Sequence, residues 1–201
     1  MMMRATWWLF VCALFALASA ALWLINAPEQ VFAYDAESWR QRLWTLWSSA
    51  LMHINGWHLF TNLVVIGALA AVGYTVDMPA PPALAWLASW PLVTLGLTLW
   101  PSVSSYVGLS GVTHAGVAVL SVWLMLHGRL AWWTLLIPVG LAVKLVGEHA
   151  WTQPIAFRPY WQFNVVFAAH LSGAVVGSIL TLGAYFFHQG ARRVTGDEGD
   201  A

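Results

Sequence analysis

Long apolar runs dominate this sequence of 201 residues. A helix needs about 20 mostly apolar residues to cross a bilayer. Six runs approach that length, at 7–25, 51–74, 83–100, 108–126, 131–149 and 164–187. Barrel strands would instead appear as alternating segments of about 10 residues. The runs therefore predict an all-α, multi-pass membrane protein with a bundle of six transmembrane helices.

The charge content supports this prediction. Charged residues make up 8% of the chain, whereas soluble domains carry roughly 25%. This excludes a soluble enzyme and a disordered chain. The single Cys12 cannot form an internal disulfide, so a disulfide scaffold is excluded too. The net charge is zero, which leaves no basic face for nucleic acid. Membrane lipid is the expected surrounding.

The first apolar run has two interpretations. Arg4 precedes it and Ala18-Ser19-Ala20 resembles a signal-peptide cleavage site. Apolar sequence continues to Ile25, past that site, which favours a retained anchor helix. Six spans place both termini on one side. The arginines divide weakly, with Arg4, Arg129, Arg192 and Arg193 on one side and Arg40, Arg42 and Arg158 on the other. The tail pair favours cytoplasmic termini.

Polar residues inside apolar runs are costly and therefore functional candidates. His58 and Asn62 are four residues apart and share a helix face, with His53 near the helix entrance. Gly108-Leu109-Ser110-Gly111 opens another run, and His114 lies one turn after Ser110. Free N–H groups at such a helix start can stabilise an oxyanion. The alternative interpretation of both sets is helix–helix packing and hydrogen bonding.

A third set brings a histidine toward that serine. Gly173 and Gly177 form a GxxxG-type face that allows close helix packing, and His170 lies on the same side. The helix carrying His170 can therefore press against the helix carrying Ser110, as a Ser–His nucleophile requires. Ser172 points elsewhere and is expected to be structural.

Lys144 and Glu148 form the fourth set. They are four residues apart and can pair. The pair is either structural or takes part in substrate recognition. If it acts only as a pair, reversing both charges together should partly restore what each single reversal damages.

Together these residues resemble the rhomboid intramembrane serine proteases. The family pattern is HxxxN in the second helix, GxSG at the head of the fourth and AHxxGxxxG in the sixth. Here it is matched by His58 to Asn62, Gly108 to Gly111 and Ala169 to Gly177, and the resemblance covers roughly residues 44–180.

The resemblance implies an intramembrane endopeptidase. Ser110 would be the nucleophile and His170 the base, in a dyad without an acidic third member. His58, Asn62 and the Ser110 N–H would bind the oxyanion, supported by Gly108, Gly111 and His114. The substrates would be transmembrane proteins, with no metal or other cofactor. The implied domains are an anchor with an interfacial loop (1–43), a protease core (44–188) and a disordered tail (189–201).

Two departures point to a subfamily. Trp44-Thr45 stands where many rhomboids have Trp-Arg, and His114 where Tyr is common. With Lys144 and Glu148, the Gly-Leu-Ser-Gly-x-x-His motif looks like the rhombosortases of the bacterial cytoplasmic (inner) membrane. That branch is associated with exported proteins whose C-terminal sorting tail contains Gly-Gly, a transmembrane helix and a basic cluster.

Other functions stay open at this point. A general rhomboid protease would cut other substrates, and a rhomboid-like binder would hold membrane segments without cutting. His53, His58, His114 and His170 could converge on a metal, although no HExxH motif is present. A transporter is disfavoured because the sequence shows no internal repeat.

Overall fold

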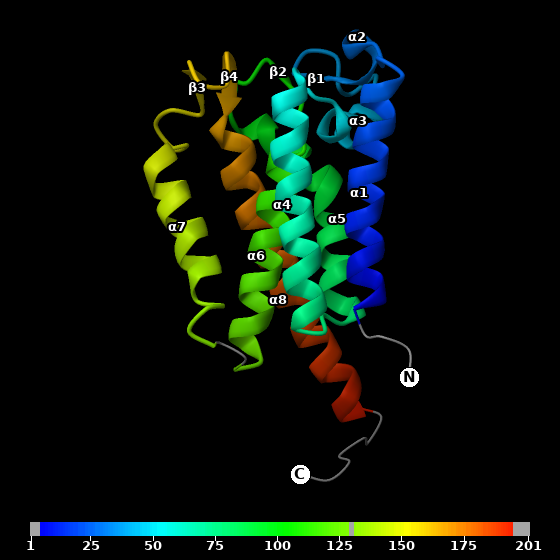
Figure 1. Cartoon of the computed structure of the whole chain (residues 1–201), viewed down its shortest axis with the longest axis vertical. Helices are drawn as coiled ribbons and strands as arrows, with labels where there is room; N and C mark the ends of the chain where they lie inside the picture. Colours follow the sequence, from blue (N-terminus) through cyan, green and yellow to red (C-terminus); the bar gives the residue numbers. More distant parts are fainter. Residues whose placement is uncertain (1–4, 129–130, 195–201) are drawn as a thin grey trace.

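Six helices run alternately between the two ends of an elongated bundle in the computed structural model, which describes residues 5–128 and 131–194 (Figure 1). They are α1 (Thr6–Leu24), α4 (Gly56–Thr75), α5 (Ala80–Gly96), α6 (Ser110–Leu126), α7 (Leu136–Glu148) and α8 (Phe167–Val194). The start of α1 and the end of α8 lie at the same end of the bundle (Figure 1).

Four of these helices are long and apolar enough to cross a membrane, at Thr6–Leu24, Gly56–Thr75, Ala80–Leu99 and Phe167–Gln189. Helix α6 is apolar but has 17 residues, and α7 has 13. The all-helical membrane class is therefore supported. Of the six expected spans, four correspond to helices long enough to cross a membrane.

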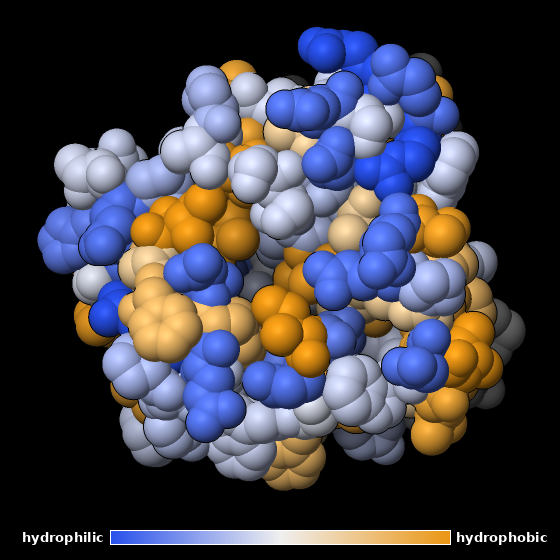
Figure 2. Space-filling view, turned by 90° about the horizontal axis from the view of Figure 1, so that it is seen from above, coloured by the Kyte–Doolittle hydropathy of each residue, from blue (hydrophilic) through white to orange (hydrophobic). Residues whose placement is uncertain are grey.

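Short elements gather at the other end of the bundle (Figure 1). They are the helices α2 (Glu29–Phe32) and α3 (Thr45–Leu51) and the 3-10 turn η1 (Leu97–Leu99). Two antiparallel ladders accompany them: β1 (Tyr34–Asp35) with β2 (Ser105–Tyr106), and β3 (Ile155–Arg158) with β4 (Phe163–Val166). Hydrophilic and hydrophobic residues are mixed on this face (Figure 2).

Several expected boundaries shift for local reasons. The predicted span 51–74 begins at Gly56, because Met52 is extended and the Asn55 side chain caps α4 by accepting from the His58 N–H at 2.8 Å. The span predicted from 164 begins at Phe167, since 163–166 is a strand. Helix α8 continues to Val194, so the expected tail from 189 begins as helix; residues 195–201, Arg4 and Arg129 lie outside the described part.

Helix α6 lies at the centre of the core, with residues buried all around it. The indole of Trp86 is fully buried and donates to the Val112 carbonyl at 2.8 Å. A Cβ at Gly116 would lie 2.6 Å from this ring, so α6 needs glycine there to admit it. The Trp8 ring packs against Trp86 at a tilt of 36°, with ring centres 4.7 Å apart, and connects α1 to the same core.

The backbones of α6 and α8 touch at two glycines. A Cβ at Gly173 would lie 2.0 Å from the Gly111 carbonyl oxygen, and one at Gly177 2.6 Å from that of Ala115. Real Cβ atoms essentially never approach this closely. The close packing predicted from the GxxxG-type spacing is therefore confirmed, and it sets the distance between Ser110 on α6 and His170 on α8.

We expect Gly173→Leu to lower the free energy of unfolding by more than about 3 kcal/mol, because the obstructing atoms belong to backbone that cannot move aside. Thermal unfolding in detergent measures this. Gly183→Leu is the matched control on the same helix, since no atom lies within 4 Å of a Cβ there. Equal melting temperatures for the two variants would contradict the packing argument.

Candidate active site

Ser110 is the first residue of α6 and follows a turn that requires glycine. Gly108 has φ +128°, which L side chains rarely adopt, and a Cβ there would lie 2.6 Å from Cε1 of His58. The Gly108 N–H donates to the Ser49 carbonyl at 3.0 Å, which fixes the turn to α3. This glycine therefore lets the loop before Ser110 pass directly against the His58 ring.

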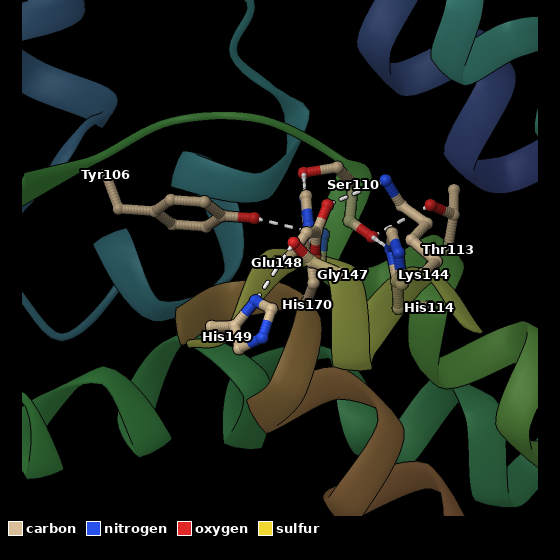
Figure 3. Close-up of polar contacts among 10 residues, drawn as sticks. Tyr106, Ser110, Thr113, His114, Lys144, Gly147, Glu148, His149 and His170 are labelled. Atoms are coloured by element: carbon tan, nitrogen blue, oxygen red, sulfur yellow. Dashed lines mark hydrogen bonds and ion pairs between the residues drawn. The ribbon is translucent and has the colours of Figure 1, made fainter. Parts of the chain in front are cut away.

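Ser110 and His170 are in hydrogen-bond contact. Oγ of Ser110 lies 3.0 Å from Nε2 of His170. Figure 3 shows the two side chains, Ser110 on α6 and His170 on α8. His170 is buried, with 4% of its surface exposed. The two residues that the sequence predicted as nucleophile and base are brought together, 60 positions apart in the chain.

Glu148 corrects the expectation of a pair without an acidic partner. Its Oε2 lies 2.8 Å from Nδ1 of His170. Because a carboxylate only accepts, Nδ1 carries the proton and Nε2 is left to accept from the Ser110 hydroxyl. Helix α7 ends at Glu148, and the left-handed His149 (φ 51°) turns the chain away. The serine, histidine and glutamate form a connected triad.

Lys144 balances the buried carboxylate. Its Nζ lies 2.7 Å from Oε1 of Glu148, on the oxygen that His170 does not use. The predicted i,i+4 pair is thus present, and Glu148 is 8% exposed. A buried carboxylate costs several kcal/mol unless it is paired, so Lys144 stabilises the charged form that His170 needs.

His114 lies flat against His170. The ring centres are 4.1 Å apart and the planes differ by 8°. Nδ1 of His114 donates to the Ser110 carbonyl at 2.6 Å, which fixes the ring orientation. His114 is therefore a stacking support that restricts rotation of the His170 imidazole.

His58 and Asn62 line the same cavity as Ser110 and His170, which has a volume of about 310 Å³. The Asn62 amide donates to the His58 carbonyl at 3.0 Å. Both side chains come from α4, and the His58 ring lies against the loop that leads into α6, where first-turn N–H groups lack intrahelical acceptors. This places the three expected oxyanion donors around one cavity. His53 is not among its lining residues.

Tyr106 is a site residue that sequence reasoning missed. Its hydroxyl donates to the Gly108 carbonyl and accepts from the Gly111 N–H at 3.3 Å, so it ties the Ser110 turn together. It lies in β2, and burial raises the pKa of the phenol to about 12, which keeps the donor proton. A Cβ at Gly111 would lie 3.0 Å from this hydroxyl, so Gly111 makes room for it. A lone tyrosine in a polar loop gives no signal of this role.

The outer wall of the cavity was also missed. It comes from the β3–β4 segment, with Arg158, Trp161, Phe163, Asn164, Val165 and Val166 among the lining residues. These aromatic and polar residues are typical of a membrane interface, so their pattern does not distinguish a site wall. Ser172 faces away, with its hydroxyl donating to the Val93 carbonyl at 2.9 Å.

The four histidines that the sequence offers as metal ligands separate into two pairs. His114 and His170 stack, whereas His53 contacts His58. The donor atoms of His114, Glu148 and His170 do lie within 4.8 Å of one another, so this group could hold an ion. Both nitrogens of His170 and both oxygens of Glu148 already make protein contacts. An ion would have to replace several of these contacts.

The structure changes the expected result of reversing the Lys144–Glu148 charges. Glu148→Lys should greatly reduce labelling of Ser110 by a fluorophosphonate, because it places an ammonium against Nδ1 of His170. The double variant Lys144→Glu/Glu148→Lys restores an ion pair but keeps that ammonium. We therefore expect labelling as low as in the single variant. Recovery in the double variant would mean that Glu148 acts only through Lys144.

In comparisons with known proteins, no family model and no curated protein matches the sequence. The residues of the site carry the functional argument.

Proposed function

We propose that the protein is an intramembrane serine endopeptidase of the rhomboid type. The contact between Nε2 of His170 and Oγ of Ser110, with Nδ1 held by Glu148, carries this proposal. A nucleophile next to an oriented base is the arrangement that covalent peptide hydrolysis needs. A non-catalytic binder of membrane segments would not need this hydrogen-bonded chain from a serine hydroxyl to a buried carboxylate.

The reaction follows from the assigned protons. His170 Nε2 takes the Ser110 proton as Oγ attacks the peptide carbonyl carbon, and Glu148 stabilises the resulting imidazolium. His58, Asn62 and the Ser110 N–H donate to the oxyanion. When the C–N bond breaks, His170 gives its proton to the leaving amine and an acyl-enzyme remains. Water, activated by His170, then releases the carboxylic acid and regenerates Ser110.

The proposal includes six spans. Helix α6 packs against the candidate spans α5 and α8, and the shorter α7 lies at the edge of the bundle next to α6 and α8 (Figure 1). The site lies at the start of α6 and α8 and the end of α7. With cytoplasmic termini it would open toward the outer face of the bacterial inner membrane, where exported proteins become accessible.

We infer the substrate class from the resemblance to rhombosortases. The substrates would be exported membrane proteins with a C-terminal Gly-Gly, helix and basic tail. The motif from Gly108 to His114 supports this subfamily, because the stacked His114 takes the place that Tyr holds in other rhomboids. A general rhomboid protease acting on other membrane segments is the alternative, and a reporter experiment separates the two.

Ser110→Ala should abolish cleavage and leave the fold unchanged, because it removes the nucleophile without adding bulk. Ser172→Ala is the matched control, since that hydroxyl donates to the Val93 carbonyl, away from Ser110 and His170, and its activity should stay near wild type. Cleavage of a co-expressed membrane reporter, read by immunoblot, measures both. Normal turnover by Ser110→Ala would contradict the assignment of Ser110 as the nucleophile.

A pair of reporters tests the substrate class. One secreted reporter carries a Gly-Gly, helix and basic tail, and the other carries the same helix without Gly-Gly. We expect the wild type to cut only the first and Ser110→Ala to cut neither. Cutting of both reporters would identify a general rhomboid protease, and cutting of neither would favour a non-catalytic binder.

A further inference from the structure

Two contacting histidines behind the catalytic cavity have unsatisfied nitrogens. His53, between α3 and α4, and His58 on α4 have ring centres 4.9 Å apart at 66°. Among the described residues, three buried side-chain polar atoms make no protein hydrogen bond, and two of them are Nε2 of His53 and Nδ1 of His58. A buried polar atom without a partner costs about 1–3 kcal/mol, so two in one contact point to a shared ligand.

The protonation of His53 follows from its other nitrogen. Nδ1 lies 3.1 Å from the Leu51 carbonyl, which can only accept, so Nδ1 carries the proton. His53 precedes the candidate span that begins at Gly56, and burial lowers the pKa of its imidazole to about 4. The ring is therefore neutral near pH 7, and Nε2 offers a lone pair and no proton.

His58 faces the catalytic loop with its other nitrogen. A Cβ at Gly108 would lie 2.9 Å from Nε2 of His58 but 3.9 Å from Nδ1. His58 also lines the cavity that contains Ser110. To donate to an oxyanion there, Nε2 must carry the proton, and then Nδ1 must accept one. Nδ1 of His58 and Nε2 of His53 thus both need a donor.

We propose that one buried water binds between His53 and His58, donates a proton to each and holds His58 in the Nε2–H form that stabilises the oxyanion. A water molecule has the two O–H groups that two acceptors require, and buried waters commonly make two to four hydrogen bonds. The hydrogen-bonded chain runs from the Leu51 carbonyl through His53, the water and His58 into the catalytic cavity. His53 is therefore a positioning residue.

His53 also lines a second cavity. It has a volume of about 340 Å³ and is lined by His53 with Trp23, Asn26 and Glu29, among others. Asn26 and Glu29 give this cavity polar groups that suit water. Each cavity is thus lined by one member of the pair, the catalytic cavity by His58 and the second cavity by His53.

The inference rests on the proposed protease function, and it is tested by a readout that does not need proteolysis. Nitrogen NMR of ¹⁵N-histidine-labelled protein distinguishes the two neutral imidazole forms, with His58→Gln used to assign the His58 signals. We expect the Nε2–H form of His58 in the wild type. In His53→Leu, which deletes the acceptor, that preference should be lost. His53→Gln keeps an acceptor and should preserve it.

Cleavage of the reporter supplies the second measurement. His53→Leu should lower kcat about tenfold with little change in KM, because oxyanion contacts form mainly in the transition state. His53→Gln should regain most of kcat. His127→Leu, at the far end of α6 against Trp123, is the control and should match the wild type.

Three outcomes overturn the inference: the Nδ1–H form of His58 in the wild type, an unchanged His58 form in His53→Leu, or unchanged kcat in that variant. If His53→Leu does not fold, the wild-type form and His53→Gln still decide. Absence of both cleavage and fluorophosphonate labelling in the wild type would instead reject the protease function, while the form of His58 could still be read.

Discussion

The backbone contact between α6 and α8 is the constraint on which the rest of the structure depends. At Gly173 and Gly177 the two helices lie so close that a single Cβ would collide with a carbonyl oxygen. Because helices are rigid over a few turns, this contact sets the separation between Ser110 and His170 at 3.0 Å. Lipid supplies no hydrophobic drive to press helices together, so small residues at the interface have that role.

The second constraint is electrostatic. A carboxylate buried in a membrane protein needs compensating partners, and Glu148 has two, His170 on one oxygen and Lys144 on the other. The ion pair keeps Glu148 charged, the charge orients His170, and the stacked His114 limits rotation of the same ring. Each residue in this series of contacts thus has a physical reason for its position, from the half-exposed Lys144 to the Ser110 hydroxyl.

The sequence predicted the parts of the site whose residues follow a regular helical spacing. His58 and Asn62 share a face because they are four apart, and the Ser110 and His170 segments carry the glycines that admit neighbouring backbones. It did not find the acid, because Glu148 reaches His170 only through the end of α7 and its left-handed turn at His149. Tyr106 and the β3–β4 wall were missed for a similar reason: they act from loops, where no periodicity exists.

The sequence by itself determined the environment and the helical class, because the scarcity of charge and the length of the apolar runs leave few other ways to satisfy the backbone in lipid. It also identified the candidate polar groups, since these interrupt the apolar runs. Only the tertiary structure decided which of them meet. Hydrogen bonds between His170, Glu148 and Ser110 depend on distances of about 3 Å between residues far apart in the chain, and local spacing carries no information about such distances.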